Sequence, residues 1–406
     1  MSEYPDASNS PPVSTLGVVP LTMLAQTIRA DRYGAPKDAF VMERVAVPEL
    51  DVDECLIRVM AAGVNHNGIW AALGHPIDVI SAHKKRDEDH DFHIAGSDAS
   101  GIVVAIGRDV VDVAIGDEVV VHCGWWDCDA VADEIMDKSA KIWGYEINFG
   151  AFAEYARVKS QAILPKPMQL SWEEAASYML CGATAYRMLH GFAPHTVKRG
   201  DVVLIWGGSG GMGSMAIQLV NAAGAIPIAV VSSDEKATYC RGIGAKGTIN
   251  RHDYRHWGGL DNIEDPENYI RWLAEARRFQ KEIWRLVGER KCPQIVIEHP
   301  GEDTFPTSSY VCAPGGMVVI CAGTSGYKGT FDIRYHWMRQ KRLQGSHFAN
   351  RTQCREFNSL IERGLVKPCL TRSFDFEDLP EAHQIMFENR EPVGNFVIRI
   401  GSRSES

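Results

Sequence analysis

Hydrophobic and polar residues follow one pattern in the first part of the chain and another after Ser171. In the first part, from about Leu21 to Lys166, short apolar runs alternate with turns that contain glycine. The clearest of these runs are ECLIRVMAAGV, SGIVVAIG, GDEVVVHC and FAEYARV. Runs of this kind, bounded by turn residues, are typical of β-strands. The pattern therefore predicts a compact β-rich domain.

Beyond Ser171, helical and strand-like segments alternate. The stretch that follows this serine, WEEAASYMLCGATAYRMLHGF, has apolar residues at helical spacing, and serine is a common helix N-cap. Next come, in alternation, the segments DVVLIW, GSMAIQLVNAAG, IPIAVV, ATYCRGIGA, QIVIEH and GMVVICA. Strands that are apolar throughout and alternate with helices indicate a parallel sheet covered on both faces. The segment Asp265–Glu289 reads as one long helix.

These two patterns predict two domains, which 406 residues are enough to form. Near the end of the chain a helical stretch, REFNSLIERGL, and a short strand, FVIRI, return to the texture of the first part. We therefore expect the β-rich domain to comprise residues 19–189 with 347–406, and the second domain residues 190–346. Residues 1–18, which are rich in serine and proline, are expected to form a disordered tail.

The composition is that of an ordinary globular protein, with 45% hydrophobic and 23% charged residues. A net charge of -10 argues against nucleic-acid binding, which needs a basic surface. No apolar run reaches the length of about 18 residues that a membrane span requires. The N-terminal stretch lacks the basic-then-apolar order of a secretory signal. We expect a cytoplasmic protein that binds neither nucleic acid nor membranes.

Ten cysteines are scattered along the chain without a CxxC pair. Such spacing fits reduced thiols in a cytoplasm better than a disulfide framework. Cys123 and Cys128 could be read as half of a zinc site, but no second pair and no histidine at ligand spacing completes four ligands. We therefore expect no metal.

The strongest motif is the loop WGGSGGMGSMAIQ, between the run DVVLIW and a helical stretch. Gly208, Gly210 and Gly213 have the G-x-G-x-x-G spacing, in which the glycines permit a tight turn, close approach to a pyrophosphate and packing of the helix on the strand. Unpaired N–H groups at the helix N-terminus then face the phosphates. A purely structural glycine turn is the alternative. The predicted dinucleotide contacts in this loop are Gly208, Ser209, Gly210, Gly211, Met212 and Gly213.

The end of the next strand, VVSSDEK, indicates which dinucleotide binds. NAD sites place an acid there for the ribose hydroxyls. This chain instead has Ser232, Ser233 and Lys236, which suit the 2′-phosphate of NADPH. Asp234 and Glu235 blur the signal and leave NADH as the alternative. The predicted NADPH contacts outside the glycine loop are Ser232, Ser233, Lys236, Gly323, Thr324 and, if the fold brings it close, Arg251.

Several long and unusual stretches resemble one family. They are AAGVNHNGIWAALG, HIAGSDASGIV, KIWGYEINFGAFAEY, IEHPGEDTFPTSSYV, VVICAGTSGY and WMRQKRLQGSHFAN. From about Leu21 to Ile400 the chain resembles the crotonyl-CoA carboxylase/reductases of the medium-chain dehydrogenase/reductase superfamily. The resemblance implies an α/β fold with a GroES-like β-rich catalytic domain and a Rossmann domain whose doubly wound parallel sheet binds NADPH. It also implies a homo-oligomer, either a dimer or a tetramer.

Two positions separate this chain from the zinc alcohol dehydrogenases of the same superfamily. Those enzymes carry a cysteine where this chain has Asn65, and Gly-His-Glu where it has Gly96-Ser97-Asp98. The metal ligands are therefore missing. Without zinc to polarise an alcohol or carbonyl, the hydride chemistry must use a substrate that is already activated, such as an enoyl thioester.

The resemblance further implies a carbon dioxide site with four residues: Asn67 in VNHNGIW, Tyr145 and Glu146 in IWGYEIN, and His347 in GSHFAN. An asparagine amide and a histidine N–H are fixed donors for the oxygens of carbon dioxide and for the carboxylate that forms. Glu146 would hold His347 or a water molecule. An aromatic wall would exclude water that protonates the enolate, although the hydroxyl of Tyr145 is itself a potential proton donor.

The function implied is NADPH-dependent reductive carboxylation of an enoyl-CoA, such as crotonyl-CoA, to an alkylmalonyl-CoA such as ethylmalonyl-CoA. Hydride would add to the β-carbon and carbon dioxide to the α-carbon. A reductase that protonates the α-carbon and a non-catalytic NADPH-binding protein are the alternatives. Because the protein is acidic, coenzyme A phosphates need a local basic patch. Arg334, in the run RYHWMRQKR, is the expected contact, and a solvated helix face is the alternative for this run.

Overall fold

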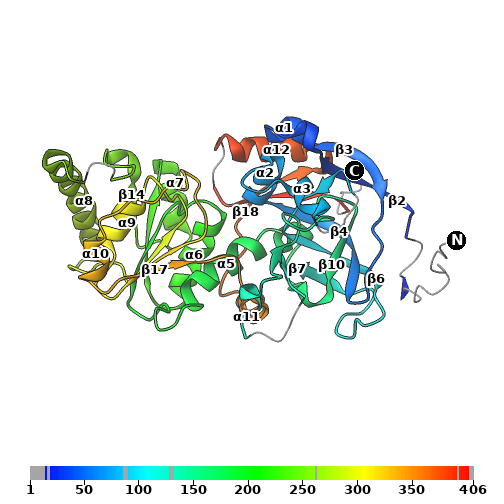
Figure 1. Ribbon diagram of the computed structural model, residues 1–406. Helices are drawn as coiled ribbons and strands as arrows, with labels where there is room; N and C mark the ends of the chain where they lie inside the picture. Colours follow the sequence, from blue (N-terminus) through cyan, green and yellow to red (C-terminus); the bar gives the residue numbers. More distant parts are fainter. Residues whose placement is uncertain are drawn as a thin grey trace. The chain divides into compact units, whose positions relative to one another are not determined.

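The computed structural model describes residues 14–15, 19–85, 90–127, 132–260, 263–390 and 393–401. The predicted tail lies almost wholly outside these residues, as does Cys128 of the possible zinc pair. The chain forms two compact units (Figure 1). The first contains the chain up to Ser177, with Arg372–Arg390 and the residues from Phe396 onward, and the second contains Tyr178–Thr371 with Glu391–Asn395. The predicted domain boundaries stay a prediction, since compactness alone does not test which segments fold together.

The first unit is built on an antiparallel sheet whose main order is β11-β7-β6-β4-β19-β18, with β1 paired to β6 and β10 to β4. The strands are β1 (Ser14–Thr15), β4 (Glu54–Val64), β6 (Ala99–Ile106), β7 (Glu118–Val121), β10 (Tyr155–Lys159), β11 (Ile163–Pro165), β18 (Leu370–Asp375) and β19 (Asn395–Arg399). The predicted runs correspond to β4, β6, β7 and β10, so the β-rich expectation is confirmed.

Smaller elements surround this sheet. The other strands of the first unit are β2 (Thr22–Ile28), β3 (Val41–Ala46), β5 (His93–Ile94), β8 (Gly124–Trp125) and β9 (Lys141–Ile142). Its helices are α1 (Pro36–Ala39), α2 (His66–Leu73), α3 (Val79–Lys84), α4 (Trp172–Ala175) and α12 (Leu379–Phe387), with 3-10 turns η2 (Ala30–Arg32), η3 (Glu134–Met136), η4 (Ser160–Ala162) and η6 (Phe376–Asp378). Strand β19 pairs antiparallel with β4, so a strand near the end of the chain joins the sheet of this unit.

The second unit contains a six-stranded sheet in the order β14-β13-β12-β15-β16-β17, in which every neighbouring pair is parallel. The strands are β12 (Val202–Ile205), β13 (Ile226–Val231), β14 (Gly247–Asn250), β15 (Ile295–Glu298), β16 (Met317–Ile320) and β17 (Arg342–Gly345). All four residues of β12 and of β15 are buried. Their continuous apolar sequences thus reflect burial on both faces, which confirms the predicted doubly wound sheet.

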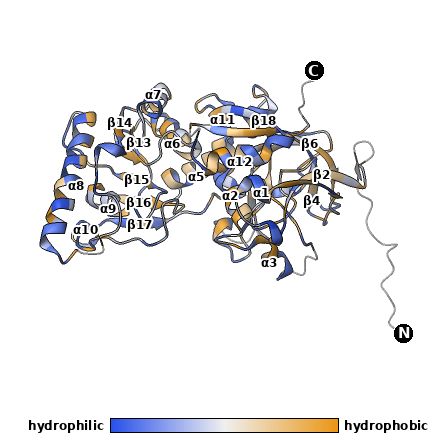
Figure 2. Cartoon of the chain, turned by 90° about the horizontal axis from the view of Figure 1, so that it is seen from above, coloured by the Kyte–Doolittle hydropathy of each residue, from blue (hydrophilic) through white to orange (hydrophobic). Residues whose placement is uncertain are grey.

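Helices of the second unit follow the strands in alternation. They are α5 (Met179–His190), α6 (Gly211–Ala222), α7 (Asp234–Gly242), α8 (Pro266–Val287), α9 (Phe305–Val311), α10 (Arg334–Trp337) and α11 (Arg351–Glu362), with the 3-10 turn η5 (Arg251–Asp253). Hydrophilic and hydrophobic residues alternate along α8 (Figure 2), and its buried residues, Trp272, Ala276, Phe279 and Ile283, recur at helical spacing. Asp265 caps this helix by accepting hydrogen bonds from the backbone of its first turn.

One predicted helix is divided in two. Ser171 forms a capping box with Glu174 at the start of α4, which confirms the expected N-cap. However, α4 ends at Ala175, and α5 begins only at Met179. Tyr178, which precedes α5, is fully buried and its hydroxyl donates a 2.6 Å hydrogen bond to Asn358 of α11. This contact joins residues that are 180 positions apart in the sequence, so local periodicity does not reveal it.

No helix in the part of the chain that the structure describes is both long and apolar enough to cross a lipid bilayer. Within the same residues, no three side chains of histidine, cysteine, aspartate or glutamate gather at a position that could hold a metal ion.

Candidate active site

The glycine-rich loop joins β12 to α6 at the carboxyl end of the parallel sheet. A Cβ atom on Gly208 would lie 2.6 Å from the Cβ of Ala229, and one on Gly213 would lie 2.3 Å from the carbonyl oxygen of Gly207. Both positions therefore need glycine for packing. A Cβ on Gly210 would have its nearest neighbour 3.6 Å away, so this residue leaves space beside the backbone. These are the different uses that the G-x-G-x-x-G spacing predicts for its glycines.

The N-terminus of α6 fits a phosphate group. Gly210 is the N-cap of this twelve-residue helix and, having no side chain, makes no capping hydrogen bond. The N–H groups of a first helical turn have no intrahelical partner, and the positive end of the helix dipole favours an anion there.

A cationic group lies at the end of β13. The ammonium of Lys236 donates a 2.7 Å hydrogen bond to the hydroxyl of Ser232. Burial lowers the pKa of Lys236, and the charge of Arg251 lowers it further, so the two cations are close enough to repel each other. The fold therefore brings Arg251 close to Lys236, and its contact with NADPH stays a prediction. An added 2′-phosphate would relieve this repulsion, whereas a ribose hydroxyl would not.

The remaining polar residues of this strand end serve the helix that follows. Ser233 is the N-cap of α7, and its hydroxyl accepts a 3.3 Å hydrogen bond from the backbone N–H of Lys236. Asp234 and Glu235 are exposed in the first turn, where negative charge stabilises a helix. These two acids, which obscured the choice of dinucleotide in the sequence, have a structural reason to be there.

Gly323 and Thr324 lie after β16, in a loop that is joined to the loop after β15. The backbone N–H of Thr324 donates to the carbonyl of His299 at 3.1 Å, and that of Ser325 donates to Pro300 at 2.8 Å. Both loops begin at the carboxyl ends of their strands. The glycine loop begins at the carboxyl end of β12, which lies at the same edge of the parallel sheet. The structure thus brings the predicted cofactor residues of the second unit to one edge of the sheet.

Glu298, which the sequence reasoning missed, fixes one of these loops. Its fully buried carboxylate accepts hydrogen bonds from the hydroxyl of Thr304 at 2.7 Å and from the backbone N–H of Gly301 at 3.1 Å, and a further one from Ser308. Burial raises the pKa of Glu298 to about 7. The sequence signal for this residue was an acid at the end of the apolar run QIVIEH, because burying a charged group is costly unless hydrogen bonds compensate it.

In the first unit, Asn67 lies in the first turn of α2. Its amide Nδ2 donates a 3.1 Å hydrogen bond to the hydroxyl of Ser97. On the same helix, the ring of Trp70 has its centroid 6.1 Å from that of Tyr145, which is 6% exposed. The helix that carries Asn67 and the loop that carries Tyr145 therefore pack together through two aromatic rings.

Glu146 closes its own turn. One of its carboxylate oxygens accepts a 2.9 Å hydrogen bond from the backbone N–H of Ile142, and its own N–H donates to the carbonyl of Ile142 at 2.8 Å. This pair of bonds holds the short loop on which Tyr145 and Glu146 lie. The expectation that Glu146 orients His347 or a water molecule stays a prediction.

His347 belongs to the second unit, two residues after β17. It is exposed, whereas its neighbours Ser346 and Phe348 are buried. Phe348 has a φ of 50°, an uncommon backbone conformation for a bulky residue, and its side chain turns inward. The local backbone therefore presents His347 at the surface of its unit, and its role in binding carbon dioxide stays a prediction.

The basic run near His347 divides into two kinds of residue. The ammonium of Lys341 donates to the carbonyl of Ser309 at 2.7 Å, and the guanidinium of Arg342 donates to the carbonyl of Phe192 at 3.2 Å. Both side chains have structural partners. Arg334, the first residue of α10, has a side chain that is 58% exposed and pairs with Asp332 at 2.7 Å. Its guanidinium lies 5.7 Å from the ring centroid of Tyr269.

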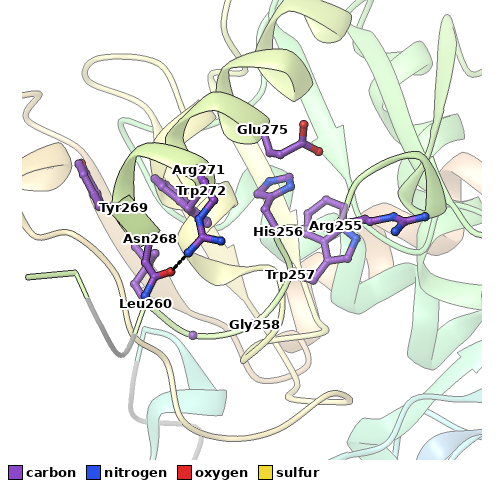
Figure 3. A pocket seen from close by; sticks show the side chains of 11 residues that line it. Arg255, His256, Trp257, Gly258, Leu260, Asn268, Tyr269, Arg271, Trp272 and Glu275 are labelled. Atoms are coloured by element: carbon purple, nitrogen blue, oxygen red, sulfur yellow. Dashed lines mark hydrogen bonds between the residues drawn. The ribbon is translucent and has the colours of Figure 1, made fainter. Parts of the chain in front are cut away.

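Tyr269 also lines a cavity of about 440 Å³ that sequence reasoning missed. The cavity lies between the first turns of α8 and the loop that follows η5, and Figure 3 shows its aromatic and cationic side chains. The lining residues are Arg255, His256, Trp257, Gly258, Gly259, Leu260, Asn268, Tyr269, Arg271, Trp272 and Glu275. Three aromatic residues and two arginines on its wall suit an aromatic, anionic ligand.

Comparison with known proteins places these features in a family. The model for the alcohol dehydrogenase GroES-like domain matches residues 51–168, and the model for zinc-binding dehydrogenases matches residues 211–363. The chain is 49% identical to the crotonyl-CoA carboxylase/reductase of Cereibacter sphaeroides, over 95% of this chain and 89% of that protein. It is 41% identical to the crotonyl-CoA reductase of Streptomyces avermitilis, over 86% of this chain and 79% of that protein.

A solved structure agrees with these matches. The crotonyl-CoA carboxylase/reductase AntE in complex with NADP superposes with a TM-score of 0.92 at 49% identity, and the match covers 98% of each chain. Both the fold expected from the sequence and the resemblance to one family are thereby confirmed. The chain belongs to the crotonyl-CoA carboxylase/reductase family of the medium-chain dehydrogenase/reductase superfamily.

Proposed function

We propose that this protein catalyses the NADPH-dependent reductive carboxylation of a short enoyl-CoA, such as crotonyl-CoA, to an alkylmalonyl-CoA, such as ethylmalonyl-CoA. The observation that carries the proposal is the match to a crotonyl-CoA carboxylase/reductase at 49% identity over 95% of the chain. Hydride adds to the β-carbon, and the enolate that results attacks carbon dioxide through its α-carbon.

NADPH fits the residues of the second unit. The first turn of α6 and Gly210 receive the pyrophosphate, and Lys236 with Arg251 receives the 2′-phosphate. The support for this assignment is the open space beside Gly210 and the mutual repulsion of the two cations. When bound, the cofactor supplies the hydride, while the protein supplies position and charge.

Carbon dioxide is assigned to Asn67, Tyr145, Glu146 and His347. The amide of Asn67 uses one N–H for Ser97, which leaves the other to donate to an oxygen of carbon dioxide. A donor held in this way stabilises the growing carboxylate without reorganising during the reaction. Trp70 and Tyr145 form an apolar wall that keeps water from the enolate.

Arg334 is the proposed contact for a phosphate of coenzyme A. Three features support it: an exposed guanidinium on a short helix, the neighbouring ring of Tyr269, and the cavity that this ring shares with two further arginines. The paired carboxylate of Asp332 orients the guanidinium and leaves some of its N–H groups for the ligand.

A reductase that protonates the α-carbon is the second candidate function. The relative from Streptomyces avermitilis, at 41% identity, carries the name crotonyl-CoA reductase, and the hydroxyl of Tyr145 is a potential proton donor. The deciding experiment measures NADPH oxidation and product mass with crotonyl-CoA, in the presence and absence of bicarbonate. A product heavier by one carboxyl group supports carboxylation, and a saturated acyl-CoA in both reactions supports plain reduction.

We also propose that the protein is a homodimer or homotetramer of the cytoplasm. The cysteines within the described residues are all free, which supports a reducing compartment. Light scattering after size-exclusion chromatography measures the oligomeric state, and a monomer at micromolar concentration would contradict that part of the proposal.

A further inference from the structure

The turn Gly96–Asp98 is hydrogen-bonded to the start of α2 by two side-chain amides. Asn65 donates from Nδ2 to a carboxylate oxygen of Asp98 at 3.0 Å, and Asn67 donates from Nδ2 to the hydroxyl of Ser97 at 3.1 Å. Asn65, Ser97 and Asp98 are 7%, 1% and 2% exposed. The Asn65–Asp98 bond is buried and the Asn67–Ser97 bond is partly buried, so both fix the relative positions of the two segments more firmly than surface contacts would.

The same turn is bonded on its other side to the segment that leads into Tyr145 and Glu146. The backbone N–H of Gly96 donates to the carbonyl of Gly144 at 3.1 Å. Gly144 has a φ of 70°, and a Cβ atom on it would lie 1.9 Å from the carbonyl oxygen of Gly96. The two backbones are thus in direct contact at the residue next to Tyr145.

Two amide hydrogen bonds join the start of α2 to the turn Gly96–Asp98, and one of these bonds comes from Asn67 itself. The contacts that hold the segments therefore also set the direction of the amide assigned to carbon dioxide.

We propose that Ser97 and Asn65 are positioning residues for the capture of carbon dioxide. Ser97 fixes the rotation of the Asn67 amide, and Asn65, through Asp98, fixes the distance between α2 and the turn that touches the Tyr145 loop. This inference rests on the proposed carboxylation. Catalysis by fixed donors depends on supporting side chains that hold them to within a fraction of an ångström. Loss of either residue should therefore slow carboxylation while hydride transfer continues.

The test compares Ser97→Ala with a matched control, Ser100→Ala. Ser100 is also fully buried and also loses one hydrogen bond on truncation, but its hydroxyl donates to the carbonyl of Trp172 at 2.7 Å and does not touch Asn67. The readout is the ratio of carboxylated to protonated product from crotonyl-CoA, NADPH and saturating bicarbonate. For Ser97→Ala we expect this ratio to fall roughly five- to tenfold, as loss of one intramolecular hydrogen bond implies. In Ser100→Ala the ratio should stay at the parent value.

Asn65→Ala provides a second variant if Ser97→Ala does not fold. The Asn65 side chain forms no capping hydrogen bond with α2, so its truncation leaves the helix N-terminus as it is. Its product ratio should fall in the same direction. Equal ratios in both variants and in the Ser100→Ala control would overturn the inference. If the parent enzyme itself yields only the protonated product, the proposed function fails, and that outcome is seen before any variant is compared.

Discussion

Replacing Lys236 by alanine should lower activity with NADPH but not with NADH. In the structure the Lys236 ammonium donates a hydrogen bond to the hydroxyl of Ser232, and the nearby positive charge of Arg251 lowers its pKa. A hydrogen bond to a charged group contributes about 1.5–3 kcal/mol, so kcat/KM for NADPH should fall roughly ten- to hundredfold. NADH lacks the 2′-phosphate, and its kcat/KM should change by less than about twofold. The assay follows the oxidation of each cofactor with crotonyl-CoA and bicarbonate.

Lys246→Ala is the matched control, because Lys246 is an exposed lysine of the same unit and lies outside the predicted cofactor contacts. This substitution removes one positive charge and should leave kcat/KM unchanged for both NADPH and NADH. Arg251→Ala should resemble Lys236→Ala. Equal losses for NADPH and NADH in Lys236→Ala would mean that the residue supports the fold and does not read the 2′-phosphate. A parent enzyme that uses both cofactors equally well would also refute this reasoning.

Three further predictions concern other residues. Burial raises the pKa of Glu298 from 4.5 to about 7, so the free energy of unfolding should fall as pH rises between those values, by about 3 kcal/mol. Glu298→Gln should remove this fall, which is measured by unfolding at several pH values, and an unchanged pH dependence would contradict the prediction. His347→Asn and Glu146→Ala should each shift the product from carboxylated to protonated acyl-CoA by a factor that corresponds to about 3 kcal/mol, while NADPH oxidation continues. Unchanged carboxylation in the purified variants would mean that His347 and Glu146 do not bind carbon dioxide. Arg334→Ala should raise KM for crotonyl-CoA more than KM for NADPH, and KM for crotonyl-CoA in the parent enzyme should rise with ionic strength. Equal changes in the two KM values of the variant would mean that the basic run around Arg334 has a structural role.

Much of the fold could be predicted because local sequence determines it. The apolar runs of β12 and β15 are continuous since both faces are buried, and Ser171 and Asp265 cap helices through atoms only two or three residues away. The glycine loop was recognisable for the same reason, since its spacing alone carries the steric requirements of Gly208 and Gly213.

Contacts between distant segments could not be predicted in this way. The bond from Asn67 to Ser97 spans 30 residues, and the bond from Tyr178 to Asn358 spans 180. Neither bond has a local signal. The cavity beside Tyr269 is likewise formed by a loop and a helix whose approach no periodicity encodes. The roles of Asn67 and His347 came from the family resemblance, and the residues around them only became visible once the chain was folded.

The most direct test of the account is the product formed from crotonyl-CoA and NADPH in the presence of ¹³C-labelled bicarbonate, analysed by mass spectrometry. Reductive carboxylation predicts ethylmalonyl-CoA that carries one labelled carboxyl carbon, formed in proportion to the NADPH consumed. Consumption of NADPH with butyryl-CoA as the main product and no incorporated label would contradict the central claim.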